Sequence, residues 1–215
     1  MRPKLLDLFC CAGGAAKGYH DAGFDVTGID IMNQPRYPYK FIQADALEYV
    51  AAHGHEFDAI HASPPCQRYS VLTGARHRDK HPYLIKPVRE ALLISGKPYI
   101  IENVSGARRE LMNPVLLCGT MFGLPIFRHR YFELSWTCML MVPPCQHDIV
   151  PVLVSGTSRR IVNGKRSMET LVADKRAAIG IDWMVGKELD EAIPPAFTKF
   201  IGEQLLLFLN PYQNG

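Results

Sequence analysis

Short apolar runs alternate with amphipathic stretches along the first half of the chain. The runs at 5–9, 24–30, 40–43, 57–62 and 98–101 have the length and composition of buried strands. Between them, residues 15–22, 46–52 and 82–95 space their apolar side chains as amphipathic helices do. Strands that alternate with helices indicate βαβ units. The pattern therefore predicts an α/β fold, Rossmann-like in architecture, built on a mostly parallel twisted sheet.

The second half of the chain is less regular. Residues 116–119 and 130–134 predict two more strands, whereas 135–170 show no strong periodicity. Helices are predicted at 173–180, 187–192 and 196–209, the last with Phe197, Ile201, Leu205 and Phe208 on its buried face. We expect three parts, which are a core at 1–134, a small inserted segment at 135–172, and C-terminal helices at 173–215 that return to the core.

The chain length and the cysteine content bound the class of protein. The 215 residues are enough for one domain with a substantial core. No apolar run reaches the length of a membrane span, and residues 1–4 lead straight into a strand, so no signal peptide is expected. The six cysteines lack the spacing of a disulfide framework, and adjacent Cys10 and Cys11 favour a reducing compartment. We therefore expect a cytoplasmic protein without a membrane partner.

Positive charge is unevenly distributed along the chain. The net charge is only +3, which is weak support for a polyanion partner. Basic residues nevertheless gather in 68–81 and again in 155–176. Two basic loops on an otherwise balanced body are typical of a nucleic-acid footprint, and equally of two solvated loops. Charge alone leaves both interpretations open.

Candidate catalytic and ligand-binding residues follow four of the predicted strands. A tight turn with Gly13 and Gly14 comes after the first strand, and Asp30 ends the second. Cys66 follows two prolines that cannot continue a strand, and Glu102 ends a later strand. Because parallel strands end at one edge of the sheet, these residues should line one ligand-binding crevice. The glycine turn leaves backbone N–H groups free for a ligand, and Asp30 is placed to accept hydrogen bonds from ribose hydroxyls.

Three other features have competing interpretations. Asp45 stands at a strand–helix junction, where Asp also caps helices. A second Pro-Pro-Cys-Gln, at 143–146, lies in a region without a clear alternation of strands and helices, and we interpret it as structural. Cys138, Cys145 and His147 are three candidate metal ligands. Their spacing matches no standard zinc pattern and a fourth ligand is not evident, so no metal is expected.

Six segments stand in a fixed order along the chain. They are Asp-Leu-Phe-Cys-Cys-Ala-Gly-Gly at 7–14, Pro-Pro-Cys-Gln at 64–67, Glu-Asn-Val at 102–104, Arg-His-Arg at 128–130, Ala-Ala-Ile-Gly-Ile-Asp-Trp at 177–183, and Ala-Ile-Pro-Pro-Ala at 192–196. In content and order they resemble the motifs of the DNA cytosine-5 methyltransferases. The compact form is similar to members of that family encoded by bacteriophages.

The resemblance implies a role for each matched residue. The S-adenosyl-L-methionine cofactor would be held by Phe9, Cys10, Cys11, Ala12, Gly13, Gly14, Asp30, Ile31, Asp45, Ala46 and Pro64. The catalytic set would be Cys66, Glu102, Arg128 and Arg130. Contacts to double-stranded DNA would come from Gln67, Arg68, Ser70, Arg76, Arg78, Arg159 and Arg160. The inserted segment 135–172 would be the target-recognition segment, and the protein is expected to act as a monomer in a restriction-modification setting.

The resemblance also implies a mechanism. Cys66 would add to carbon 6 of a cytosine flipped out of the duplex, which makes carbon 5 reactive enough to accept a methyl group. Glu102 would hold or protonate ring nitrogen 3, and Arg130, with Arg128, would bind oxygen 2 or hold the catalytic loop.

The sequence departs from the family pattern at three places. Cys11 stands where the first glycine of the cofactor turn is usual, and Ile126 replaces the glutamine before the paired arginines. Asp190 and Glu191 replace a Gly-Asn pair in the last motif. The recognition segment is also short, which favours a short target site.

Several other functions share these features. The same fold can methylate RNA, and the Cys11 departure is compatible with an altered cofactor that donates a modified one-carbon group. A catalytically silent DNA-binding or cofactor-binding module is a further alternative, against which intact Cys66, Glu102 and Arg130 count. A cysteine hydrolase fits least, because no histidine is clearly tied to Cys66 and His61 should point elsewhere.

Overall fold

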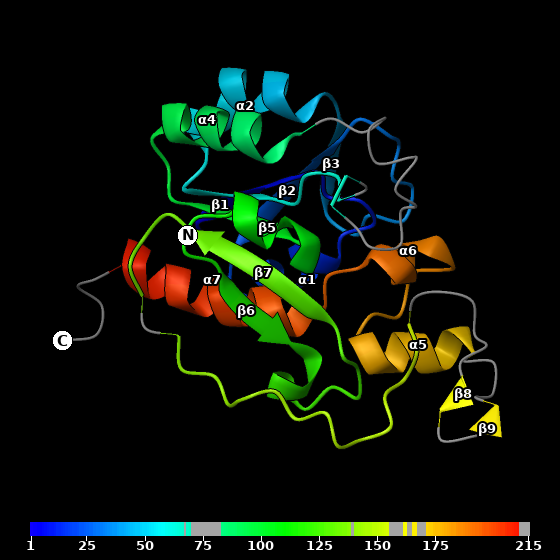
Figure 1. Ribbon diagram of the computed structural model, residues 1–215. Helices are drawn as coiled ribbons and strands as arrows, with labels where there is room; N and C mark the ends of the chain where they lie inside the picture. The colour runs from blue at the N-terminus through cyan, green and yellow to red at the C-terminus, as the bar shows by residue number, and fades with distance from the viewer. Residues whose placement is uncertain are drawn as a thin grey trace.

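The protein is built on a seven-stranded sheet. The computed structural model describes residues 1–66, 68–69, 83–138, 140–154, 161–162, 165–166 and 171–210. Within these residues the strand order is β3-β2-β1-β4-β5-β7-β6 (Figure 1). The strands are β1 (Lys4–Leu8), β2 (Asp25–Asp30), β3 (Lys40–Gln43), β4 (Ala59–Ala62), β5 (Tyr99–Asn103), β6 (Val115–Cys118) and β7 (His129–Leu134).

The sheet is mostly parallel, as the sequence predicted. Strands β1 to β5 pair in parallel, and the chain reverses the strand order between β1 and β4, next to which α/β proteins bind ligands. Strand β7 runs antiparallel to both β5 and β6. The central strands are covered on both faces, which explains why their sequences are continuous apolar runs rather than alternating ones.

Helices cover both faces of the sheet. Helices α2 (Ala46–His53) and α4 (Ile85–Ser95) lie on one face, and α1 (Gly14–Ala22) and α7 (Pro195–Leu209) lie on the other (Figure 1). Helices α5 (Val172–Ile179) and α6 (Lys187–Glu191) follow the short hairpin of β8 (Ile161–Val162) and β9 (Lys165–Arg166). Short 3-10 helices occupy Gly54–Glu56, Ser105–Glu110 and Gly119–Phe122. In the described part of the chain, no helix is both long and apolar enough to cross a bilayer.

The contact between α1 and α7 closes the apolar layer under the sheet. Thr198 of α7 donates a hydrogen bond to the carbonyl of Ala15, 2.9 Å away. A Cβ atom on Gly18 would come within 2.2 Å of the Pro195 carbonyl, so only glycine allows this approach of the two backbones. The predicted buried face of the closing helix is wrong at its end, because Phe208 is 48% exposed and only stacks on Trp136.

The predicted elements are confirmed with small shifts at their ends. The strand predicted at 57–62 begins only at Ala59, although Phe57 stays buried in the core. The helix predicted at 82–95 begins at Ile85, and Glu102 lies inside β5 rather than after it. These differences are of the size expected where helices and strands fray.

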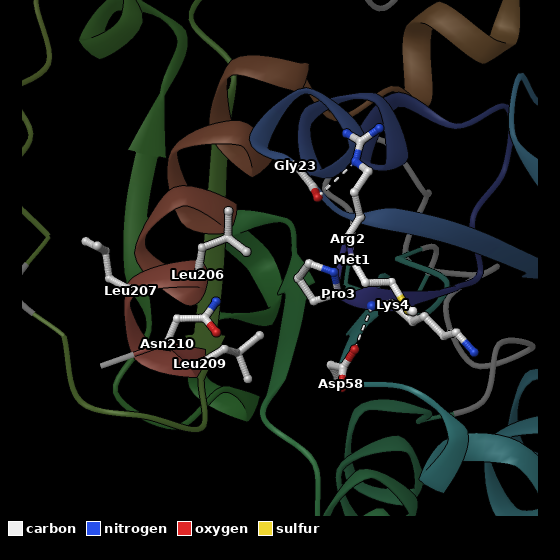
Figure 2. A pocket seen from close by; sticks show the side chains of 10 residues that line it. All are labelled: Met1, Arg2, Pro3, Lys4, Gly23, Asp58, Leu206, Leu207, Leu209 and Asn210. Atoms are coloured by element: carbon white, nitrogen blue, oxygen red, sulfur yellow. Dashed lines mark hydrogen bonds between the residues drawn. The ribbon is translucent and has the colours of Figure 1, made fainter. Parts of the chain in front are cut away.

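The amino edge of the sheet carries an open hollow of about 820 Å³ (Figure 2). Residues 1–4, Gly23 and Asp58 line it together with Leu206 and Leu209 of α7. Its walls are tied by hydrogen bonds from Arg2 to the Gly23 carbonyl and from the Lys4 amide to Asp58. Since ligands of α/β sheets bind at the carboxyl edge, this hollow is on the wrong side for the predicted site.

Candidate active site at the carboxyl edge

The turn after β1 is the first part of the site. It contains three residues in the left-handed region, Phe9 with φ 59°, Cys11 with φ 45° and Gly13 with φ 88°. This conformation costs a residue other than glycine roughly 1–2 kcal/mol. The departure at Cys11 therefore places a strained residue at a position that glycine would occupy without strain. The Cys11 side chain is exposed at this edge of the sheet.

Asp30 fixes this turn from the neighbouring strand. Its Oδ2 accepts a hydrogen bond from the Cys11 amide at 3.0 Å, and its Oδ1 accepts one from the Met32 amide at 2.9 Å. Ile31 next to it is 64% exposed, which is unusual for a large apolar side chain. A carboxylate beside an uncovered apolar surface suits a ligand that combines a ribose with an adenine ring.

Asp45 caps helix α2. Its Oδ1 accepts hydrogen bonds from the amides of Leu47 and Glu48 at 2.8 and 3.0 Å, so the capping interpretation is confirmed. Both bonds use Oδ1. Among the described residues nothing bonds Oδ2, so Oδ2 is available to a ligand. Ala46, which was predicted to bind the cofactor, is buried as the first residue of the helix.

The remaining residues of the predicted cofactor turn face inward. The amide of Cys10, a buried residue, donates to the Ile29 carbonyl at 3.1 Å. The carbonyl of Ala12 accepts a hydrogen bond from the indole of Trp183, 2.9 Å away. Gly14 begins α1 so close to the backbone of Ile193 that a Cβ would lie 2.7 Å from its carbonyl oxygen. The segments 177–183 and 192–196 therefore support the turn from behind.

Asp7 is buried in β1 beneath the turn. Burial raises the pKa of its carboxyl from 3.8 to about 8, although a hydrogen bond from Tyr37 opposes this shift and Asp30 adds to it. Its Oδ1 has no hydrogen-bond partner among the described residues. The carboxyl is therefore mostly protonated in the folded protein below pH 8 and ionised in the unfolded chain.

This difference predicts that stability falls as pH rises from 3.8 to about 8 and levels off above that range. Unfolding releases the Asp7 proton at any pH between 3.8 and about 8, so we expect a loss of about 2 kcal/mol between about pH 6.5 and pH 8.5. Asp7→Asn keeps the side-chain shape without a titrating group and should flatten that slope. Urea unfolding of both proteins across this window measures it.

The pH range above 6.5 also excludes a contribution from His61, whose effect on stability has the opposite pH dependence. Burial lowers the pKa of His61 to about 3, so His61 destabilises the fold only below its unfolded value near 6.5. Equal slopes for wild type and Asp7→Asn above pH 6.5 would contradict the assignment to Asp7.

The turn that carries Cys66 is tied to both neighbouring strands. The Ser63 amide donates to the Leu8 carbonyl of β1 at 3.2 Å. The Asn103 side chain of β5 donates to the carbonyl of buried Pro64 at 2.9 Å, and its own oxygen accepts from the Val104 amide. These bonds hold the two prolines against the carboxyl edge, as predicted. Asn103 was not predicted to have a role, yet its side chain fixes the turn that carries Cys66.

Cys66, Glu102 and Arg130 come together at this edge. The Nε atom of Arg130 lies 2.9 Å from Oε1 of Glu102, and the pair is largely buried. Burial raises the pKa of the Cys66 thiol; the Glu102 charge raises it further, and Arg130 opposes both effects. Burial also raises the pKa of the Glu102 carboxyl, against the opposing effects of Arg130 and of a hydrogen bond with Ser63.

Arg128 lies beside this group but bonds elsewhere. It is buried, and its guanidinium donates to the Asp190 carbonyl at 2.5 Å. Its Nε has no hydrogen-bond partner among the described residues. Burial, together with Arg130, lowers the pKa of Arg128 to about 9, so it stays charged at neutral pH. The arginine segment is thus joined to the Asp190 position, where the sequence departs from the motif that it otherwise resembles.

A buried chain of polar groups leads to Glu102. Tyr19 lies 2.9 Å from Nδ1 of His61, and Nε2 of His61 lies 2.8 Å from the Ser63 hydroxyl, which bonds Glu102. Because His61 is neutral, one consistent assignment has Tyr19 donating to His61, His61 to Ser63, and Ser63 to the carboxylate. His61 was expected to point away from Cys66, and it does so while still serving the same site through Ser63.

The predicted DNA contacts are only partly described. Arg68 lies 4.2 Å above the Tyr83 ring and also bonds the Tyr83 hydroxyl. Six other predicted contact residues lie outside the described residues; they are Gln67, Ser70, Arg76, Arg78, Arg159 and Arg160. The target-recognition segment is likewise described only in part.

The three candidate metal ligands of the sequence do not form one group. Cys145 and His147 do lie together, but Cys138 is not part of the group. Their neighbours are Cys118 and His129, which β6 and β7 bring opposite each other in the antiparallel pair. The sequence did not connect these residues because the hairpin register cannot be read from it.

The fold is that of the α/β methyltransferases, as predicted. It matches S. pombe Dnmt2 methyltransferase with a TM-score of 0.61 at 13% identity, over 99% of this chain and 100% of that one. It matches Entamoeba histolytica methyltransferase EhMeth with a TM-score of 0.54 at 14% identity, over 100% of both chains. Both likenesses extend over almost the whole chain and show the fold.

Three type II methyltransferases are similar to the chain in sequence. M.XorII of Xanthomonas oryzae pv. oryzae is 29% identical over 126 residues, which are 49% of this chain and 29% of that protein. M.AgeI of Thalassovita gelatinovora is 28% identical over 168 residues, covering 60% and 38%. M.AquIA of Picosynechococcus is 28% identical over 183 residues, covering 61% and 71%. The chain thus spans well under half the length of the first two, and no family model matches it.

The residues at the carboxyl edge fit the methyl donor. Asp30 offers a carboxylate for the ribose, Oδ2 of Asp45 is available to the adenine, and Ile31 offers an uncovered apolar surface. The charges of Asp30 and Cys66 both raise the pKa of the Cys11 thiol, which therefore lies near both groups. These residues are where the donor would be bound and oriented.

Proposed function

We propose that the chain methylates carbon 5 of cytosine in double-stranded DNA, through a covalent bond between Cys66 and carbon 6 of the base. The observation that carries the proposal is the meeting of Cys66, Glu102 and Arg130 beside the cofactor turn. The similarity to type II methyltransferases supports DNA as the substrate. The bound donor supplies an electrophilic methyl group on a sulfonium.

Cys66 is the nucleophile in this proposal. Its thiol must lose a proton to attack, and burial opposes that loss, whereas the Arg130 cation favours it. Attack on carbon 6 makes carbon 5 electron-rich, so carbon 5 takes the methyl group. A base then removes the carbon 5 proton, and Cys66 leaves as the carbon 5–carbon 6 double bond reforms.

Glu102 is the acid that faces the base. Burial favours the protonated form of its carboxyl, whereas Arg130 and Ser63 favour the carboxylate; the protonated form can donate to ring nitrogen 3 as negative charge develops there. The Tyr19–His61–Ser63 chain orients the carboxyl and limits its rotation. Such a buried network keeps the acid in position before the substrate arrives.

The two arginines have separate tasks. Arg130 stays beside Glu102, where its guanidinium can bind oxygen 2 of the base. Arg128 is a positioning residue. Its guanidinium is bonded to the Asp190 carbonyl, which holds the start of β7 and thereby places Arg130 two residues later. The target cytosine reaches these groups only after it leaves the base stack, which costs a few kcal/mol. The segment 135–172 is the proposed target-recognition segment.

A labelling experiment tests the proposal. Purified protein is incubated with tritiated S-adenosyl-L-methionine and mixed-sequence duplex DNA, beside the same duplex with 5-methylcytosine at every cytosine and beside structured RNA. We expect label only in the unmodified duplex, at carbon 5 of cytosine after digestion to nucleosides. Label on adenine, on the exocyclic amine of cytosine or only in RNA would contradict the proposal.

A further inference from the structure

Four metal-ligand side chains form a cluster beside the β6–β7 hairpin. Two of them come from the segment Cys145-Gln146-His147, here called the Cys-x-His segment, in the irregular chain after β7. Cys118 ends β6, His129 begins β7, and Cys145 and His147 come from the later segment. The ligand atoms of all four lie within 4.8 Å of one another. We propose that Cys118, His129, Cys145 and His147 bind one structural Zn²⁺ ion.

The distances suit a tetrahedral site. The Sγ of Cys118 lies 3.4 Å from Nε2 of His147, and the Sγ of Cys145 lies 3.6 Å from Nε2 of His129. Zinc binds sulfur at about 2.3 Å and nitrogen at about 2.0–2.1 Å, so sulfur and nitrogen at two corners of a tetrahedron are about 3.6 Å apart. Both sulfur–nitrogen distances already have that length.

The donor set selects the metal and its role. Two thiolates and two neutral imidazoles are soft and borderline ligands, which in tetrahedral array favour zinc, and the thiolate charges balance the ion. Four protein ligands leave no open position for a substrate, so the site is structural rather than catalytic. Cys118 is buried and His147 is exposed, so the ion can enter from the solvent side.

A neighbouring hydroxyl supports the ligands. Thr120 lies 3.3 Å from the Sγ of Cys118 and accepts a hydrogen bond from the Gln146 amide at 3.2 Å. It therefore joins the hairpin to the Cys-x-His segment beside the ligands. The His147 ring is also held between the rings of Phe127 and His129, at 4.4 and 5.1 Å. Ligands restrained in this way are typical of metal sites.

The site has a structural purpose at this place. The described residues between β7 and β8 form no helix or strand, and such long irregular segments need external support. His129 also lies between Arg128 and Arg130 in sequence, so an ion on His129 would fix the start of β7 from the side opposite the arginines. The second Pro-Pro-Cys-Gln thus supplies a zinc ligand, where the first supplies the nucleophile.

Metal analysis of the full chain tests the proposal. The protein is expressed with zinc in the medium, purified under reducing conditions without chelator, and analysed by plasma mass spectrometry. We expect about one zinc per chain for wild type, below about 0.1 for the double variant Cys145→Ser/His147→Ala, and an unchanged value for Cys138→Ser. Cys138 is the matched control, because it is a nearby cysteine outside the group.

Wild type alone also decides the matter if the double variant fails to fold. Cobalt added to chelator-treated protein should give the visible absorption of tetrahedral Co²⁺ with thiolate charge-transfer bands. Wild type that holds no stoichiometric zinc and takes up neither metal would overturn the proposal, as would iron with acid-labile sulfide, a Cys118–Cys145 disulfide, or full zinc retention by the double variant.

Discussion

Cys66→Ala should lower methyl transfer at least about 10⁴-fold, because the substitution removes the atom that makes carbon 5 reactive. The variant should also fail to form a denaturant-stable complex with a duplex that contains 5-fluorocytosine, which traps the covalent intermediate in wild type. Binding of S-adenosyl-L-methionine should persist, since the turn after β1 is held by Asp30 and Trp183 rather than by the thiol.

The control for this result is Cys138→Ser, which removes a cysteine that lies outside the site. It should retain wild-type transfer and trapping. Transfer by Cys66→Ala within tenfold of wild type, in protein that binds the donor normally, would rule out covalent catalysis by Cys66. Loss of donor binding in the variant would instead indicate that the thiol shapes the cofactor pocket.

Glu133→Ala should destabilise the fold by about 3–5 kcal/mol, because it leaves a largely buried guanidinium without its carboxylate. Glu133 is 1% exposed and accepts hydrogen bonds from Arg89 at 2.6 and 2.7 Å, from the Met112 amide at 2.8 Å and from Tyr99 at 3.2 Å. All these bonds are lost at once. Urea unfolding should show the change, and thermal unfolding should shift by about 10 °C or more.

A second variant separates the charge from the packing. In Arg89→Met/Glu133→Leu both charged partners are replaced by apolar side chains of similar size, and much of the lost stability should return. Removal of the exposed pair Lys199–Glu203 should change stability by less than about 0.5 kcal/mol. A cost for Glu133→Ala no larger than that of the exposed pair would contradict the buried-pair argument.

The sequence predicted those features that depend on neighbours along the chain. Period and turn residues placed Asp30 at the end of β2, Cys66 shortly after β4 and Glu102 within one residue of the end of β5, without knowledge of the fold. Asp45 had both a capping and a cofactor-binding interpretation in the sequence. The cap is confirmed, since capping is a contact between residues two and three apart, and the cofactor contact stays a prediction.

Features that depend on strand pairing were missed. Cys118 and His129 become neighbours only through the antiparallel register of β6 and β7. Asn103 and Ser63 have their roles because β5 and β1 flank the same turn. An apolar pattern shows which face of an element is buried but not which element lies next to it, so these contacts were outside its reach. Phe208 was wrongly predicted to be buried for a related reason, because the core ends before the helix does.

The contact between α1 and α7 has a consequence for how the protein is made. The hydrogen bond from Thr198 to Ala15 joins residues 183 positions apart. During translation, α1 emerges from the ribosome before α7. Its apolar side chains stay uncovered until α7 has been synthesised, after almost the whole domain. Closing so long a loop is slow, so the nascent protein must remain soluble with one face of its sheet bare. Chaperone capture of the nascent chain should therefore end when α7 emerges.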